Sequence, residues 1–140
     1  MTGNEFRDAI VNYIKSWNSN IDIKLEVPVG YRFVNSVRKV DIVLHYNRKF
    51  LGIEAKYQEG QGTAYQKLLY TLEDCKTAPI PIIIVFAGDG IKTDIKSKLI
   101  TSGYGIEVKL ENGKIKENYP ILLQRIAIEL GINWLNLFDK

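Results

Sequence analysis

The chain contains very little sulfur and imidazole, with one cysteine, one methionine and one histidine among 140 residues. The single cysteine, Cys75, excludes an intramolecular disulfide, which fits a reducing compartment. One histidine and one cysteine are too few for the usual zinc ligand sets. His45 lies close to a predicted hairpin turn and is interpreted as a surface or pairing residue, so any metal chemistry must use other side chains.

Long apolar runs are absent too. The most apolar run, residues 80–87, is far too short to span a bilayer, and the N-terminus lacks the basic and apolar regions of a signal peptide. We therefore expect a soluble, cytoplasmic protein. The net charge of +3 and the pI near 8.9 are compatible with a nucleic-acid partner. The cations are spread along the chain, however, and do not demand such a partner.

The remaining composition and patterning predict one folded unit over residues 1–140. A hydrophobic fraction of 46% is ordinary for a globular domain of this length. Thr2 and Glu5 have the spacing of a helix capping box, and apolar residues recur at helical spacing to Trp17. Beyond them the patterns predict strands over 21–29, 37–44, 50–57, 82–87, 105–110 and 114–116, and helices over 63–75, 93–101 and 121–130. This order, αβββαβαββα, predicts a single α/β domain with a mixed sheet and helices on both of its faces.

Three charged residues stand out on the apolar strands 37–44 and 50–57. A hairpin that turns at Asn47 and Arg48 places Asp41 directly opposite Glu54. Because side chains alternate faces along a strand, Glu54 and Lys56 share one face, and Asp41 joins them from the opposite strand. Directly opposed Cβ atoms are only about 5 Å apart. The hairpin therefore brings two carboxylates and one ammonium together on a surface that is otherwise apolar.

This cluster predicts a site for a hard divalent cation. Mg²⁺, with Mn²⁺ as a substitute, prefers oxygen ligands and is typically held by one or two carboxylates. Asp41 and Glu54 would supply the carboxylates, and the backbone carbonyl of Ala55 lies within reach of the same ion. Lys56 would orient a water, assist its deprotonation or stabilise charge on a phosphodiester. The alternative is an ordinary cross-strand salt bridge to Lys56 or Lys39, although two opposed acids destabilise a strand pair unless a positive charge lies between them.

The spacing of these residues resembles a known signature. Val40-Asp41, followed after 13 residues by Glu54-Ala55-Lys56, is similar to the motif of the PD-(D/E)XK nuclease superfamily. That superfamily includes many restriction enzymes, archaeal Holliday-junction resolvases and RecB-type exonuclease domains. The family's proline is Val40 here, which is a departure from the pattern.

The resemblance implies a fold and an activity. The family core is αβββαβ, and the predicted order agrees with it from residue 2 to residue 87, with a C-terminal βα extension beyond. The fold would be restriction-endonuclease-like. The activity would be that of a Mg²⁺-dependent DNA endonuclease that hydrolyses phosphodiester bonds, with Asp41, Glu54 and Lys56 as catalytic residues.

Two further positions match the family. Glu5 corresponds to an acidic residue that many members place on the first helix as an additional metal ligand, although completing the capping box with Thr2 would also explain it. Gln66 and Tyr70 match a Gln-hydrophobic-x-x-Tyr motif of the RecB-like branch, so Gln66 is expected to support the catalytic site. Tyr70 has the alternative of being a core residue.

Contacts to DNA are less defined in the sequence. Cations near the hairpin are candidates for a phosphate-facing rim, namely Arg38, Lys39, Arg48, Lys49 and Lys67, with Arg32 before them. Scattered cations are also typical of any solvated surface. The apolar tail, with Trp134, Leu137 and Phe138, predicts either a homodimer or a cover for the domain's own sheet.

Several functions remain open at this point. A restriction-type or mobile-element endonuclease would favour one duplex sequence, whereas a junction resolvase would prefer a four-way junction of any sequence. A nucleic-acid-binding or assembly subunit that needs a partner for activity would bind DNA without cutting it. A purely structural hairpin would not respond to Mg²⁺ or Mn²⁺.

Overall fold

The computed structural model describes the backbone of residues 1–31, 36–60 and 64–133, and the side chains of these residues except 64–66. The elements follow the predicted order with one additional strand. They are α1 (Gly3–Trp17), β1 (Asp22–Tyr31), β2 (Val37–Tyr46), β3 (Lys49–Tyr57), α2 (Ala64–Lys76), β4 (Ile82–Ala87), α3 (Thr93–Thr101), β5 (Gly105–Glu107), β6 (Lys109–Glu111), β7 (Lys114–Lys116) and α4 (Ile121–Leu130).

The central sheet is mixed, as predicted. Its strand order is β1-β2-β3-β4-β5. β2 is antiparallel to both β1 and β3, whereas β4 is parallel to β3 and β5. The parallel pairs require crossover connections, which α2 and α3 provide.

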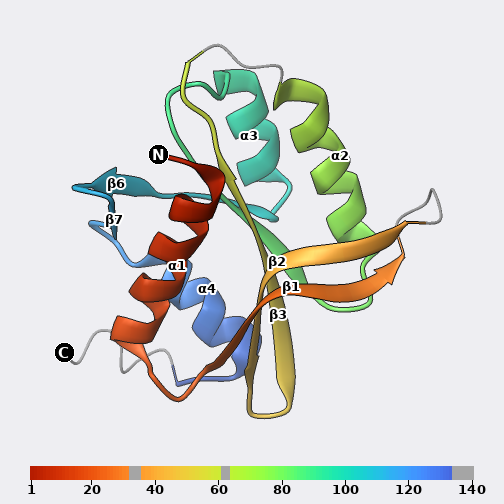
Figure 1. Cartoon of the computed structure of the whole chain (residues 1–140), viewed down its shortest axis with the longest axis vertical. Helices are drawn as coiled ribbons and strands as arrows, with labels where there is room; N and C mark the ends of the chain where they lie inside the picture. Colours follow the sequence, from red (N-terminus) through yellow and green to blue (C-terminus); the bar gives the residue numbers. More distant parts are fainter. Residues whose placement is uncertain (32–35, 61–63, 134–140) are drawn as a thin grey trace.

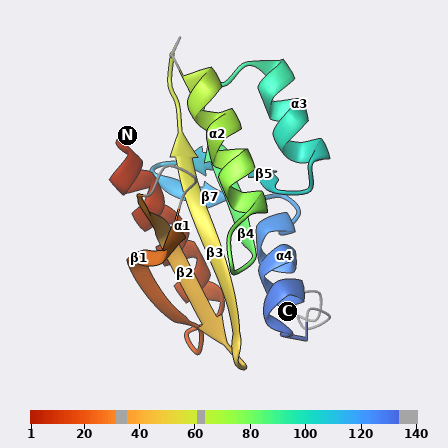
Figure 2. The ribbon, with the colours of Figure 1, turned by 90° about the vertical axis from the view of Figure 1, so that its right-hand side faces the viewer.

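Helices cover both faces of this sheet (Figures 1 and 2). α1 and α4 pack on one face in a core that includes Ile10, Leu44 and Ile126. α2 and α3 pack on the other face, around Leu72 and other apolar side chains. All six residues of β4 are buried, which confirms the prediction of a central strand covered on both faces. In the part of the chain that the structure describes, no helix is both long enough and apolar enough to cross a membrane.

The predicted strand over residues 105–110 is wrong in one respect, because it is divided in two. β5 joins the main sheet, whereas β6 pairs with β7 in a separate two-stranded sheet. Val108 lies between β5 and β6 with its side chain buried, and its amide donates a hydrogen bond to the carbonyl of Phe86. The alternation of side chains continues through Val108, so the pattern does not reveal that the chain changes partner there.

The β2–β3 hairpin has the predicted turn and register. Asn47 and Arg48 both have positive φ, as a two-residue turn of this handedness requires. The ladder runs from the Tyr46–Lys49 pair to the Ile42–Ile53 pair and ends there. Beyond this point residues 37–40 of β2 pair only with β1, and Figure 1 shows the two strands bending away from β3. We call residues 27–31 and 37–40 the β1–β2 arm, and the point at which β2 leaves β3 the fork.

Candidate active site

Asp41 lies at the fork, one position beyond the last paired residue of the ladder. Its Oδ2 accepts a hydrogen bond of 2.8 Å from the backbone N–H of Ala55. In a continuous ladder a backbone carbonyl of β2 would accept the Ala55 N–H. Here the Asp41 carboxylate accepts it instead. The N–H and C=O of one residue point to the same side of an extended strand. The Ala55 carbonyl therefore faces the same fork.

Glu54 is almost fully buried, with 7% of its surface exposed. It pairs in register with Ile84 of β4 on the face that α2 covers. Burial, and then the charge of Asp41, raise the pKa of Glu54 to about 7, while the charge of Lys56 acts in the opposite direction. Burial and the neighbouring carboxylate together thus outweigh the attraction of Lys56 for the ionised form of Glu54.

Lys56 is the only cation that either carboxylate pairs with among the described residues. Its Nζ lies 3.9 Å from Oε2 of Glu54, and its side chain is 37% exposed. One ammonium at this distance does not neutralise two carboxylates, which disfavours an ordinary cross-strand salt bridge as the whole explanation. The ammonium is also open to solvent, and therefore to a ligand.

The donor set fits a hard divalent cation. The Asp41 and Glu54 carboxylates are neighbours at the fork, which the Ala55 carbonyl also faces, and Mg²⁺ and Mn²⁺ prefer such oxygen donors. A divalent cation between the two carboxylates would offset the Asp41 charge that raises the pKa of Glu54. The residues present are therefore suited to the metal that the sequence predicts.

Glu5 does not lie with these residues. Its side chain completes the capping box of α1, because Oε1 accepts the Thr2 amide at 2.9 Å and the Glu5 amide donates to the Thr2 hydroxyl at 3.1 Å. The hydrogen bond from the Thr2 backbone lowers the pKa of Glu5. Among the described residues no group of three or more His, Cys, Asp or Glu side chains is arranged to hold a metal. Gln66 lies in the first turn of α2, and its side chain is outside the described residues.

The predicted phosphate-facing cations are dispersed. Lys39 is exposed on the β1–β2 arm and Lys67 is exposed on α2. Arg48 and Lys49 lie at the far end of the hairpin, roughly 20 Å from the fork at the usual rise per residue of a strand. Arg38 is 1% exposed and bound to protein groups, so it is unavailable to a phosphate. Arg32 and the predicted tail residues 134–140 are outside the described residues.

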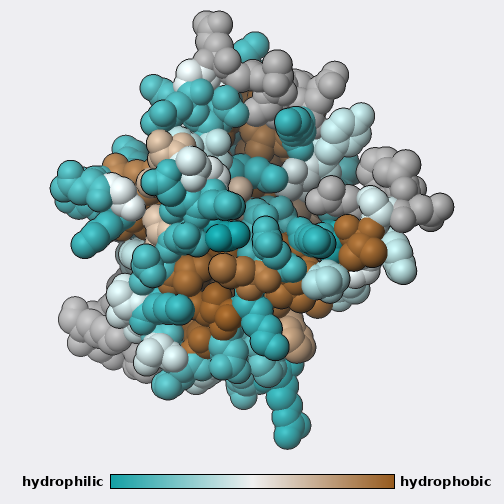
Figure 3. Space-filling view, in the orientation of Figure 1, coloured by the Kyte–Doolittle hydropathy of each residue, from teal (hydrophilic) through white to brown (hydrophobic). Residues whose placement is uncertain are grey.

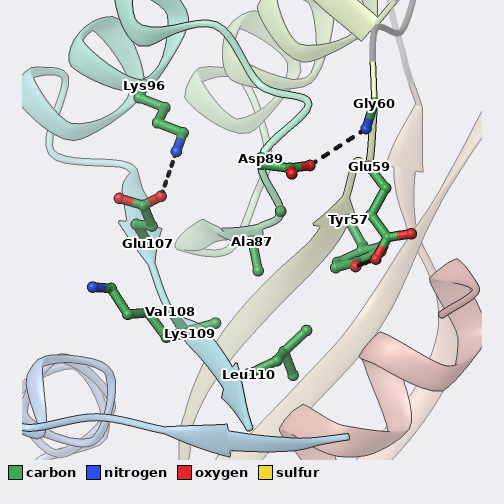
Figure 4. A pocket seen from close by; sticks show the side chains of 11 residues that line it. Tyr57, Glu59, Gly60, Ala87, Asp89, Lys96, Glu107, Val108, Lys109 and Leu110 are labelled. Atoms are coloured by element: carbon green, nitrogen blue, oxygen red, sulfur yellow. Dashed lines mark hydrogen bonds and ion pairs between the residues drawn. The ribbon is translucent and has the colours of Figure 1, made fainter.

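A second acidic region lies at the carboxyl ends of β3, β4 and β5 (Figure 4). It is a hollow of about 620 Å³, which we call the strand-end hollow. Each of its acids has a partner: the Glu59 carboxylate and the Tyr57 hydroxyl are hydrogen-bonded, Asp89 accepts the Gly60 amide at 3.4 Å, and Glu107 pairs with Lys96 at 2.8 Å. The hydrogen bond to Glu59 raises the pKa of Tyr57 to about 12. Glu107 is thus paired with a cation, whereas Glu59 and Asp89 have neutral hydrogen-bond partners.

Sequence reasoning missed one residue near the site, Asp74. It is the partner of Arg38 and precedes Cys75, a buried residue on the inward face of α2. Its only signal in the sequence is its position beside the inward-facing residues Leu72 and Cys75. That signal does not indicate which cation it meets.

One known protein family is similar to this chain over most of its length. A family model described as a PD-(D/E)XK nuclease superfamily domain matches residues 3–123 of the chain. The match extends beyond residue 87 and includes β5, β6, β7 and the start of α4, which the sequence alone had left as an extension. No curated protein matches the sequence.

Proposed function

Because the chain belongs to the PD-(D/E)XK nuclease superfamily, we propose that it is a Mg²⁺-dependent DNA endonuclease whose reaction takes place at the fork. The observation that carries this proposal is the buried Glu54 beside Asp41, with a single, half-exposed lysine between them and solvent. A restriction-type or mobile-element role fits a small chain with one such site.

The roles of the residues follow from their positions. Asp41, Glu54 and the carbonyl of Ala55 would hold the metal ion. When bound, the ion supplies a Lewis acid for the phosphodiester and a water of lowered pKa. The Lys56 ammonium, which is open to solvent, can donate to a phosphate oxygen or orient the attacking water. Gln66 is proposed as a supporting residue on the strength of its match to the family motif.

The substrate is proposed to be DNA held by its backbone. Lys39 on the arm and Lys67 on α2 are exposed. Lys39 precedes Asp41 on β2, and Lys67 lies on the helix that follows β3. Contacts of this kind position a nucleic acid without reading its sequence. The basic pI of the chain, near 8.9, supports the same class of partner.

A homodimer is proposed as the active form on duplex DNA, because cutting both strands with one site per chain generally needs two copies. Figure 3 shows apolar side chains gathered across the lower middle of one face. Exposed apolar residues of the described chain include Leu25, Phe50 and Ile128. Sedimentation of the purified chain with and without DNA tests this, and a monomer under both conditions would contradict it.

The decisive experiment is cleavage of supercoiled plasmid and of a synthetic four-way junction, with and without Mg²⁺. We expect Mg²⁺-dependent cutting that is lost in Asp41→Ala and Lys56→Ala. Preference for the junction over duplex would favour a resolvase. DNA binding without cutting would favour a subunit that needs a partner. Cutting by the wild type and both variants alike would refute the proposed site.

A further inference from the structure

Arg38 is a fully buried cation three residues before Asp41 on β2. Its Nε and Nη2 donate to the two carboxylate oxygens of Asp74, each at 2.8 Å. Its Nη1 donates to the carbonyl of Val29 at 2.9 Å, and Nη2 also reaches the carbonyl of Tyr31 at 3.3 Å. One guanidinium therefore joins β2, β1 and α2.

The contacts of Arg38 with Asp74, Val29 and Tyr31, which we call the joint, lie where β2 leaves β3. In a ladder continued at the same register, Val40 would face Ala55 and Lys39 would face Lys56, which would place two ammonium groups directly opposite each other. In the structure Val40 and Lys39 have no partner on β3 and keep only their pairs with Val27 and Pro28 of β1, on the other edge of β2. The Ala55 amide donates its hydrogen bond to the Asp41 carboxylate.

We propose that Arg38 is a positioning residue, which acts through Asp41 by holding the β1–β2 arm on α2 and so keeping the fork open. It does not contact substrate or metal, because its donors are already bound within the protein. If the arm were released, the segment before Asp41 could approach β3, and the carboxylate would lose its fixed place beside Ala55 and Glu54. The consequence for catalysis rests on the proposed function, whereas the effect on Asp41 does not.

The chemistry of the joint requires arginine. A guanidinium has five N–H donors in a planar arrangement that matches a carboxylate, whereas lysine carries all its donors on one nitrogen. Lysine at position 38 would keep the charge but could not bind both Asp74 oxygens and the two β1 carbonyls together. Arg38→Lys therefore changes the geometry of the joint more than its charge.

The test uses the full chain, labelled with ¹⁵N, as wild type, Arg38→Lys and Asp74→Asn. The first readout is the chemical shift and hydrogen exchange of the Ala55 amide, which reports on its bond to Asp41. The second is the dissociation constant for Mn²⁺ alone by calorimetry. In both variants we expect exchange of this amide to speed up about tenfold. We also expect Mn²⁺ binding to weaken roughly tenfold to a hundredfold, as for other residues that orient a metal ligand.

Tyr13→Phe is the matched control. It removes the 2.8 Å hydrogen bond from the Tyr13 hydroxyl to Glu117, a half-buried contact on the α1 side of the sheet. It is expected to lower the melting temperature without changing the Ala55 amide or Mn²⁺ binding. The same result in Arg38→Lys would mean that the joint is only structural and would overturn the proposal.

A double change separates positioning from packing. Arg38→Met with Asp74→Leu replaces a buried ion pair by apolar groups, which often restores stability. We expect the melting temperature to recover while the Ala55 amide and Mn²⁺ binding remain impaired, and recovery of all three would overturn the proposal. If neither the double change nor the single variants fold, the role is structural and the proposal fails. If the wild type neither binds Mn²⁺ nor cuts DNA, the proposed function fails, and the Ala55 amide still decides the role of Arg38.

Discussion

The fork and the strand-end hollow are both acidic, but Glu54 at the fork is buried whereas the acids of the hollow are exposed. In the hollow, Glu107 has Lys96 at 2.8 Å and Asp89 has a backbone amide. At the fork, Glu54 has Lys56 at 3.9 Å, Asp41 accepts the Ala55 amide at 2.8 Å, and the pKa of Glu54 is raised to about 7. The number of acidic residues therefore does not distinguish the two regions. Burial of one carboxylate beside another does, because it raises the free energy of the ionised form.

The comparison predicts first a large difference in activity. Asp41→Asn should reduce Mg²⁺-dependent cleavage at least about a thousandfold, or about 4 kcal/mol, because it removes charge and a metal ligand. Glu107→Gln makes the same chemical change in the hollow and should leave cleavage within about twofold. Single-turnover rates on plasmid measure both. Equal losses in the two variants would remove the distinction between the regions.

The second difference is in the pH dependence of stability without divalent metal. The pKa of Glu54 in the folded chain, about 7, lies above its ordinary value of 4.5. Protonation of Glu54 therefore stabilises the folded chain. This contribution is fully present below pH 4.5 and is lost as the pH rises through 7. The free energy of unfolding should fall by about 3 kcal/mol across this window. Denaturant melts in EDTA measure it.

Glu54→Gln should remove most of this slope and raise the stability at pH 8. Asp89→Asn in the hollow is the control and should leave the slope as in the wild type. A wild-type slope in Glu54→Gln would show that another group is responsible.

The third difference is in the response to metal. At a concentration one hundred times its dissociation constant, Mg²⁺ or Mn²⁺ should stabilise the wild type by about 2.7 kcal/mol. The effect should be larger at pH 8 than at pH 5.5, because the ligands bind as carboxylates. Melting temperatures with and without metal measure it. Asp41→Asn should lose the effect and Glu107→Gln should keep it, so a metal effect that survives in Asp41→Asn places the cation elsewhere.

The smallest effect is expected inside the hollow itself. Lys96→Met breaks the ion pair with Glu107. The side chains of both residues are partly exposed. Such pairs contribute up to about 1 kcal/mol, so the variant should fold with nearly unchanged stability and cleave at the wild-type rate. Thermal melts and the plasmid assay check this. A large loss of cleavage would bring the hollow into the active site.

Local rules were sufficient where neighbours in the chain determine the geometry. The capping box of Thr2 and Glu5 begins α1, and the turn at Asn47 and Arg48 sets the register that brings Asp41 to Glu54. Period-two alternation then puts Lys56 on the same face. The fold class and the charged cluster therefore follow from the sequence, because each depends on residues that are close together along the chain or joined by one short turn.

Contacts between elements that are distant along the chain could not be predicted from local patterns. Arg38 had the pattern of a surface cation, yet it is buried because Asp74, 36 positions away, meets it from another element. The strand at 105–110 divides at Val108 because β4 and β7 offer different partners. The opening of the fork is of the same kind, since a continuous hairpin satisfies the local pattern equally well. Short-range patterns thus predict which charges meet, whereas the packing of distant elements sets the geometry in which they meet.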